Sequence, residues 1–143
     1  GLLQKMVELL QKKVIEPKKR TLEQTIEIMA EAHATFEGYY LPDTLARRLN
    51  NPGVLLFVGQ ANAKKHTSGF CQFETAEQGW DALRRQLGLN LSGTSKLYNL
   101  EMNFYDYIDV YASTSPKHER ENYAEYIAKQ LGVKPTNKLK DLL

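Results

Sequence analysis

The sequence predicts a mostly helical, α+β domain with one small β-hairpin. Two stretches begin with a capping box, a threonine followed three residues later by a glutamine, at Thr21/Gln24 and Thr75/Gln78. Each box precedes apolar residues at the three- and four-residue spacing of a helix that buries one face. A short apolar run over residues 54–58 follows a polar turn and fits a strand. We therefore expect five to seven helices and one hairpin.

The composition is that of an ordinary globular chain. It has 143 residues, of which 42% are hydrophobic and 25% charged, and a net charge of +2. A chain of this length buries about 70% of the surface of its unfolded form, so its core needs no disulfide or metal to be stable. The single cysteine, Cys71, rules out an internal disulfide and fits a reducing compartment.

Charge and hydropathy argue against two kinds of partner. The basic residues are spread out and acidic residues occur on every predicted helix, so we expect no nucleic acid. No apolar run approaches the about 20 residues of a membrane span, and no signal peptide is visible.

The first predicted helix covers residues 2–15 and ends before Pro17. Its apolar residues recur at helical spacing, which is typical of a packing or connecting helix; binding to another subunit is the alternative. We divide the chain accordingly into an N-terminal helix and connector, residues 1–20, and a main domain, residues 21–143.

The second predicted helix follows Thr21 and runs into Glu37, where Gly38 is a natural stop. His33 lies on its apolar stripe and is expected to be a packed side chain. Glu37 falls about 60° from the centre of that stripe, whereas the other glutamates of the helix lie farther round, in solvent. Partial burial and the negative end of the helix dipole both raise the pKa of a carboxyl group, as a general acid requires. An ordinary helix-end glutamate is the alternative.

The remaining elements follow from turn and periodicity signals. Residues 42–49 fit a short helix starting at Pro42 or Asp43, and a strong turn follows at residues 50–53. We expect residues 54–58 to pair with residues 69–73 across a polar loop. The later expectations are a helix after Thr75, a loop over residues 88–100, helices over 104–111 and 119–131, the latter ending at Gly132, and a last turn capped by Asn137.

Metal and thiol chemistry find little support. The three histidines, His33, His66 and His118, lack metal-ligand spacing with each other or with Cys71. A thiolate pair of Cys71 with His66 is conceivable, but a lone cysteine in a strand is more often buried. We expect neither a metal nor a cofactor.

Several motifs occur in a recognisable order. They are Glu37-Gly38, then Asn50-Asn51-Pro52-Gly53, then Gly69-Phe70-x-x-Phe73-x-Thr75-x-Glu77-x-Gly79-Trp80. This order resembles a lysozyme-like domain found among bacteriophage virion proteins and muralytic enzymes, and it covers residues 21–143. The run Gly69-Phe70-Cys71-Gln72 is also similar to the Gly-Leu-Met-Gln element of lytic transglycosylases, whose glutamine lines the glycan cleft.

The resemblance implies a lysozyme-like fold that cleaves peptidoglycan between N-acetylmuramic acid and N-acetylglucosamine, with Glu37 as the catalytic acid. The glycan strand would be its partner, with capsid or tail proteins as further candidate partners, in a virion-associated protein acting in the host cell envelope or periplasm. The candidate substrate-binding residues are Tyr39, Tyr40, Asn50, Asn51, Phe70, Gln72 and Tyr111.

Two features leave the activity open. Glycosidases usually use two carboxylates, and neither Asp43, Glu74 nor Glu77 stands out as the second. A lytic transglycosylase mechanism, in which the sugar's own hydroxyl attacks, needs only one. The family commonly has an asparagine after the Asn-Asn-Pro-Gly motif, where this chain has Val54. An inactive, structural or glycan-binding virion protein is therefore the alternative function.

Overall fold

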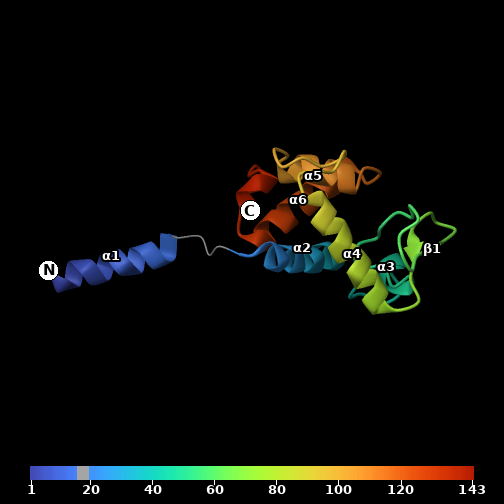
Figure 1. Ribbon diagram of the computed structural model, residues 1–143, viewed down its shortest axis with the longest axis horizontal. Coiled ribbons are helices and arrows are strands. Elements are labelled where there is room, and N and C mark those ends of the chain that lie inside the picture. The colour runs from blue at the N-terminus through green and yellow to red at the C-terminus, as the bar shows by residue number, and fades with distance from the viewer. Residues whose placement is uncertain (16–19) are drawn as a thin grey trace.

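The computed structural model describes residues 1–15 and 20–143, and the described chain is mostly helical with one small antiparallel sheet, as predicted (Figure 1). None of the described helices has the length and apolar character needed to cross a membrane. The elements are α1 (Leu2–Ile15), α2 (Leu22–Phe36), α3 (Leu45–Arg48), β1 (Lys64–Lys65), β2 (Cys71–Gln72), α4 (Ala76–Asn90), α5 (Phe104–Tyr111), α6 (Lys117–Leu131) and the 3-10 helix η1 (Leu139–Leu142).

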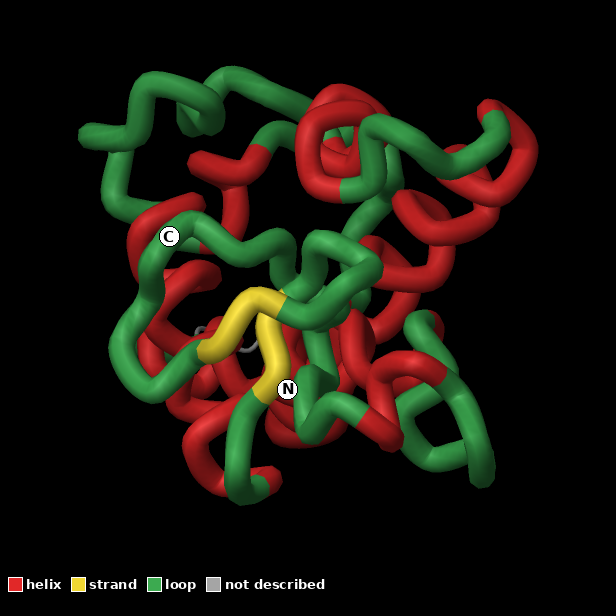
Figure 2. The backbone as a smooth tube through the Cα atoms, turned by 90° about the vertical axis from the view of Figure 1, so that its right-hand side faces the viewer, coloured by secondary structure: helices red, strands yellow, loops and turns green. Residues whose placement is uncertain are grey.

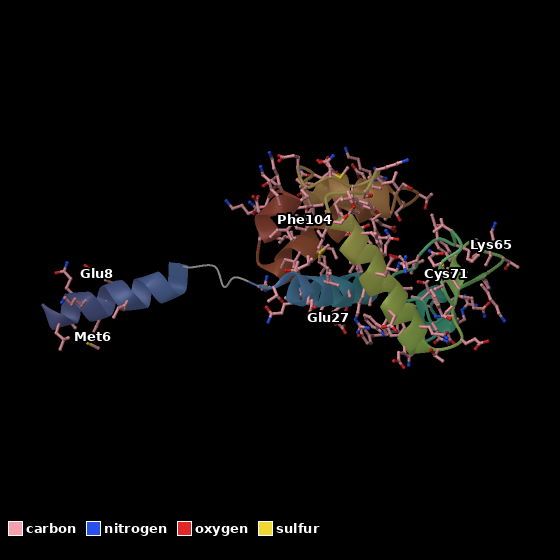
Figure 3. The ribbon with its side chains drawn as sticks, viewed as in Figure 1. Met6, Glu8, Glu27, Lys65, Cys71 and Phe104 are labelled. Atoms are coloured by element: carbon pink, nitrogen blue, oxygen red, sulfur yellow. The ribbon has the colours of Figure 1, made fainter. Side chains whose placement is uncertain are left out.

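Helix α1 confirms the helix predicted over residues 2–15, while Pro17 lies outside the described residues. The helix extends away from the other elements, as Met6 and Glu8 show in Figure 3. Its apolar side chains are exposed at Leu2, Leu3, Met6, Val7 and Leu9.

Both predicted capping boxes are formed. At the start of α2, Thr21 Oγ1 accepts a hydrogen bond from Gln24 N at 3.1 Å, and Gln24 Oε1 accepts one from Thr21 N at 3.0 Å. Thr75 and Gln78 repeat this pattern at the start of α4. These bonds satisfy backbone donors that a helix start otherwise leaves free.

The helical core forms where α2 packs against α4 and α6, and α5 packs against α6. Helix α4 continues to Asn90, so the loop predicted from residue 88 begins too early. The reason is burial: Leu87 and Asn90 face the core and hold the last turn in place. The largest fully buried side chains are Tyr107, Tyr123, Phe104, Met29, Leu83 and Leu87.

The hairpin differs from the predicted pairing. Its strands are β1 and β2, with Lys64 opposite Gln72 and Lys65 opposite Cys71 (Figures 2 and 3). The apolar run over residues 54–58 is not a strand and makes one isolated bridge, between Leu56 and Phe70.

Backbone turning explains why that run stays short. Val54 and Gly59, near its two ends, have positive φ angles of 48° and 87°, which turn the chain out of the extended conformation. Between them, Phe57 N donates to Gly69 O at 3.0 Å and Cys71 N donates to Leu55 O at 2.8 Å. The run therefore pairs with the segment around Gly69, as predicted, but over too few residues to form a strand.

Two other boundaries shift by a few residues. Helix α3 starts after Thr44 and not at Pro42 or Asp43, because Asp43 has a φ of 63° and Thr44 Oγ1 caps Arg47 N. Helix α6 begins at Lys117 and ends, as predicted, at Gly132, whose φ is 73°.

The last turn is capped differently from the prediction. The side chain of Asp141 accepts from Lys138 N at 2.9 Å, whereas Asn137 Oδ1 accepts from Lys134 N at 2.8 Å. Asn137 therefore closes the preceding turn and does not cap η1.

Candidate active site

Glu37 is the residue at which α2 ends. Its N–H donates to His33 O at 2.9 Å, and Gly38, with a φ of 81°, turns the chain away. Glycine accepts this left-handed conformation without strain, so the helix stops here and leaves the Glu37 side chain at its edge.

The Glu37 side chain is half-buried and lines a cavity of about 300 Å³. The cavity lies between the end of α2 and the start of α6. Besides Glu37, its lining residues are Phe36, Ser115, Glu119 and Tyr123. One wall is therefore aromatic, with the Phe36 and Tyr123 rings stacked 4.1 Å apart between centroids.

Burial raises the pKa of Glu37 to about 7, and the negative charge of Glu119 adds to this effect. Removing a carboxylate from water disfavours its charged form, and a like charge nearby disfavours it further. The Glu37 carboxyl group is therefore largely protonated below neutral pH and can donate a proton to a bound ligand.

A buried hydrogen-bond network supports the floor of this cavity. His33, which is fully buried, lies 2.6 Å from the Tyr123 hydroxyl through Nδ1 and 2.9 Å from the Tyr107 hydroxyl through Nε2. Asn90 Nδ2 donates to the same Tyr107 hydroxyl at 3.3 Å. Burial lowers the pKa of His33 to about 3, so the ring is neutral and donates through one nitrogen while accepting through the other.

The packed role predicted for His33 is confirmed. Its ring also lies 4.1 Å from the ring of Tyr111, centroid to centroid. Burial raises the pKa values of the Tyr111 and Tyr123 hydroxyls, with the charge of Glu37 as a further cause. The groups beneath Glu37 are thus neutral.

Three of the predicted substrate-binding residues have side chains that are packed or hydrogen-bonded within the protein. Tyr39 is buried and packs edge-on against Trp80, with ring centroids 5.4 Å apart. Asn51 is buried and bonds Leu55 N, Leu55 O and Cys71 O through its amide. Tyr111 donates its hydroxyl proton to Gly53 O at 2.7 Å. Asn51 and Tyr111 thus brace the turn at residues 50–53.

The other four predicted residues lie nearer the surface. Tyr40 is exposed and donates to Glu31 Oε2 at 2.6 Å. Asn50 Nδ2 donates to Phe73 O at 3.0 Å, and Phe70 is half-buried in its bridge to Leu56. The Tyr40 and Asn50 side chains are thus engaged within the fold, and Phe70 is held through its backbone bridge.

Gln72 is exposed and lines a different pocket from Glu37. That pocket has a volume of about 400 Å³ and also contains Lys64, Glu74 and Gln78. The structure therefore does not bring Glu37 and Gln72 into one cavity, although both lie at the surface of the same domain.

Val54, which follows the turn at residues 50–53, stands in the left-handed region with a φ of 48°. This conformation is unfavourable for a β-branched residue, and asparagine tolerates it far better. An asparagine would therefore suit the backbone at this position better than Val54 does.

Cys71 does not form a thiolate pair with His66. The Cys71 thiol is buried and donates to Leu56 O at 3.6 Å, and burial raises its pKa to about 11. His66 Nδ1 lies 2.8 Å from the Ser68 hydroxyl instead. Within residues 1–15 and 20–143, no group of three or more His, Cys, Asp or Glu side chains is arranged to hold a metal ion.

The carboxylate that shares the cavity with Glu37 is Glu119, which the sequence did not single out. Glu119 lies in the first turn of α6, where acidic residues are common because the positive end of the helix dipole stabilises their charge. Of the three acids considered from the sequence, Glu74 lines the Gln72 pocket, and Asp43 and Glu77 are exposed outside the Glu37 cavity.

Comparisons with protein-family models, curated proteins and solved structures found no match for this chain. A functional assignment rests on the motif order and on the residues around Glu37.

Proposed function

We propose that this chain is a phage-associated, peptidoglycan-degrading glycosidase or lytic transglycosylase in which Glu37 is the general acid. The observation that carries the proposal is the half-buried Glu37 carboxyl group, which lines a cavity and has a pKa raised to about 7. A carboxyl group with such a pKa still holds its proton close to neutral pH, where an ordinary glutamate has lost it.

In the proposed reaction, Glu37 gives its proton to the glycosidic oxygen between N-acetylmuramic acid and N-acetylglucosamine. The C–O bond breaks, its electron pair goes to the leaving oxygen, and positive charge develops at the anomeric carbon. Water or the sugar's own hydroxyl then attacks that carbon, and the proton it releases returns to the Glu37 carboxylate. The resemblance carried by the motif order supports the further proposal that this chemistry belongs to a virion-associated protein acting in the host envelope.

The proposal is tested with purified peptidoglycan sacculi and the full chain. Wild type, Glu37→Gln and Glu23→Gln are incubated with sacculi, and soluble muropeptides are separated and weighed by mass spectrometry. Glu23 is a matched control because it is an exposed carboxylate on the same helix. We expect release by wild type and Glu23→Gln, and a loss of at least about 100-fold in Glu37→Gln. Equal release by Glu37→Gln, or none by wild type, contradicts the proposal.

The products also separate the two mechanisms. Attack by water leaves a reducing end on the muramic acid residue, whereas attack by the sugar's own hydroxyl leaves an anhydro end that is lighter by one water. The mass of the released fragments therefore identifies the attacking group.

A second candidate function is a catalytically inactive, structural or glycan-binding virion protein. The observation that favours it is the separation of Glu37 and Gln72 into different pockets, with Tyr39 and Asn51 buried. This candidate predicts that the chain sediments with sacculi, or with a capsid or tail protein, and releases no muropeptides.

A further inference from the structure

The start of α6 is fixed against α5 by Arg120. Arg120 Nε donates to Asp109 Oδ1 at 3.0 Å, and Nη1 donates to Ser115 O at 2.5 Å. One side chain thus ties the first turn of α6 to α5 and to the loop over residues 113–116. Because Glu119 precedes Arg120 in that turn, the same contacts hold Glu119 at the rim of the Glu37 cavity.

The groups near Glu37 come from two helices and one loop. Helix α5 contributes Tyr111, α6 contributes Tyr123 and Glu119, and the loop contributes Ser115. The neutral His33 of α2 bonds the Tyr123 hydroxyl and does not line the cavity. Among the described residues that line the cavity, Glu119 is the other carboxylate, and none is a lysine, arginine or histidine. The guanidinium of Arg120 is engaged by Asp109 and Ser115.

We propose that Glu119 is a positioning residue for Glu37: lining the same cavity, its negative charge adds to burial in favouring the protonated form of Glu37 and so raises the upper pH limit for proton donation. The effect of Glu119 on the pH range of catalysis rests on the proposed function. The effect of Glu119 on the protonation of Glu37 does not. Its physical basis is repulsion between two carboxylates beside a partly desolvated cavity.

Exposure of Glu119 gives the pairing a second property. Glu119 is exposed, so dissolved ions screen its charge, and its influence on Glu37 falls as ionic strength rises. Burial of Glu37 persists at any salt concentration. The two contributions to its protonation can therefore be separated by salt.

The test is an NMR titration of the Glu37 side-chain carboxyl carbon in the full chain, assigned by the signal lost in Glu37→Gln. Wild type, Glu119→Gln and Glu121→Gln are compared at low and high salt. Glu121 is the matched control, since it is an exposed carboxylate on α6 that lines a different pocket. We expect Glu119→Gln to lower the midpoint by about 0.5 to 1 pH unit at low salt, and by less at high salt. Glu121→Gln should titrate close to wild type.

A midpoint in Glu119→Gln equal to that of wild type overturns the proposal, provided thermal unfolding shows that the variant is folded. Glu119→Lys should lower the midpoint further, and a rise would also overturn it. In the peptidoglycan assay, the alkaline limit of activity should move with the titration midpoint. A shifted midpoint with no muropeptide release by any variant supports the pairing while refuting the proposed function.

Discussion

Gly79 of α4 faces the carbonyl oxygen of Asn50 so closely that a Cβ atom on Gly79 would lie 1.8 Å from that oxygen. The same helix approaches the next part of the turn, where a Cβ on Gly53 would lie 2.5 Å from Leu83 Cδ1. Helix α4 and the turn at residues 50–53 are therefore interlocked. This contact accounts for two glycines of the motif order by packing alone.

Gly79→Ala should accordingly destabilise the fold by about 3 kcal/mol or more, because backbone cannot move aside as a flexible side chain does. Urea unfolding followed by circular dichroism measures the change. Gly88→Ala is the matched control on the same helix, where the nearest atom is Ile26 Cδ1 at 3.9 Å. This control should be neutral or stabilising by up to about 1 kcal/mol, since alanine favours helix. Equal effects of the two substitutions would refute the interlocking.

Val54→Asn should stabilise the chain by about 0.5 to 1 kcal/mol. The reason is the φ of 48° at this position, which costs a β-branched residue more than asparagine. Some apolar contact is lost, because Val54 packs at the edge of the cluster of Ala34, Tyr39 and Ala46. The midpoint of urea unfolding reports the net change, with the exposed Val58→Asn as control. A loss of stability in Val54→Asn larger than in Val58→Asn contradicts this explanation.

Buried His33 should make the fold sensitive to acid. Its folded-state pKa of about 3 lies below the unfolded value of 6.5, so the unfolded chain binds more protons between these pH values. The stability contribution of the neutral ring is complete above pH 6.5 and is lost as pH falls through this window, by at most about 1.4 kcal/mol per pH unit. In urea unfolding at a series of pH values, His33→Gln should flatten the dependence, and the exposed His118→Gln should not. A slope unchanged in His33→Gln would contradict the assignment.

Glu37 should act with the opposite sign. Its folded-state pKa of about 7 lies above the unfolded value of 4.5, so the folded chain binds more protons between them. Its contribution is complete below pH 4.5 and is lost as pH rises through 7. Relative to wild type, Glu37→Gln should therefore gain stability with rising pH across this window, by up to about 3 kcal/mol. A stability difference that does not change with pH would show that Glu37 ionises as freely as in the unfolded chain.

Local signals predicted the helices well. The Thr21 and Thr75 capping boxes and the helix end at Gly132 depend on bonds or angles within a few residues. The residues that cause these features therefore lie within the short stretch that predicts them. The strand over residues 54–58 was mispredicted because an apolar run does not reveal that Val54 adopts a positive φ. The turn just before Val54 packs closely against α4 through Gly53 and Gly79, and such contacts between distant parts of the chain are not visible in a local apolar run.

The site was predictable only in part. Glu37 stood out because its place on the helix and the following glycine are both local. The burial of Tyr39 and Asn51 and the engagement of Tyr111 depend on distant contacts with Trp80, Cys71 and Gly53. Glu119 belongs to a helix far along the chain from Glu37. In the sequence it is explained by its position in a first helical turn, where a negative charge is favourable, so nothing connects it to Glu37.

The most direct test of the central claim is the pH dependence of muropeptide release from sacculi by wild type and Glu37→Gln. If Glu37 is the general acid, release by wild type should fall as pH rises through about 7, and Glu37→Gln should release little at any pH. Release by wild type that persists unchanged well above pH 7, or that survives in Glu37→Gln, would contradict the assignment of Glu37 as the proton donor.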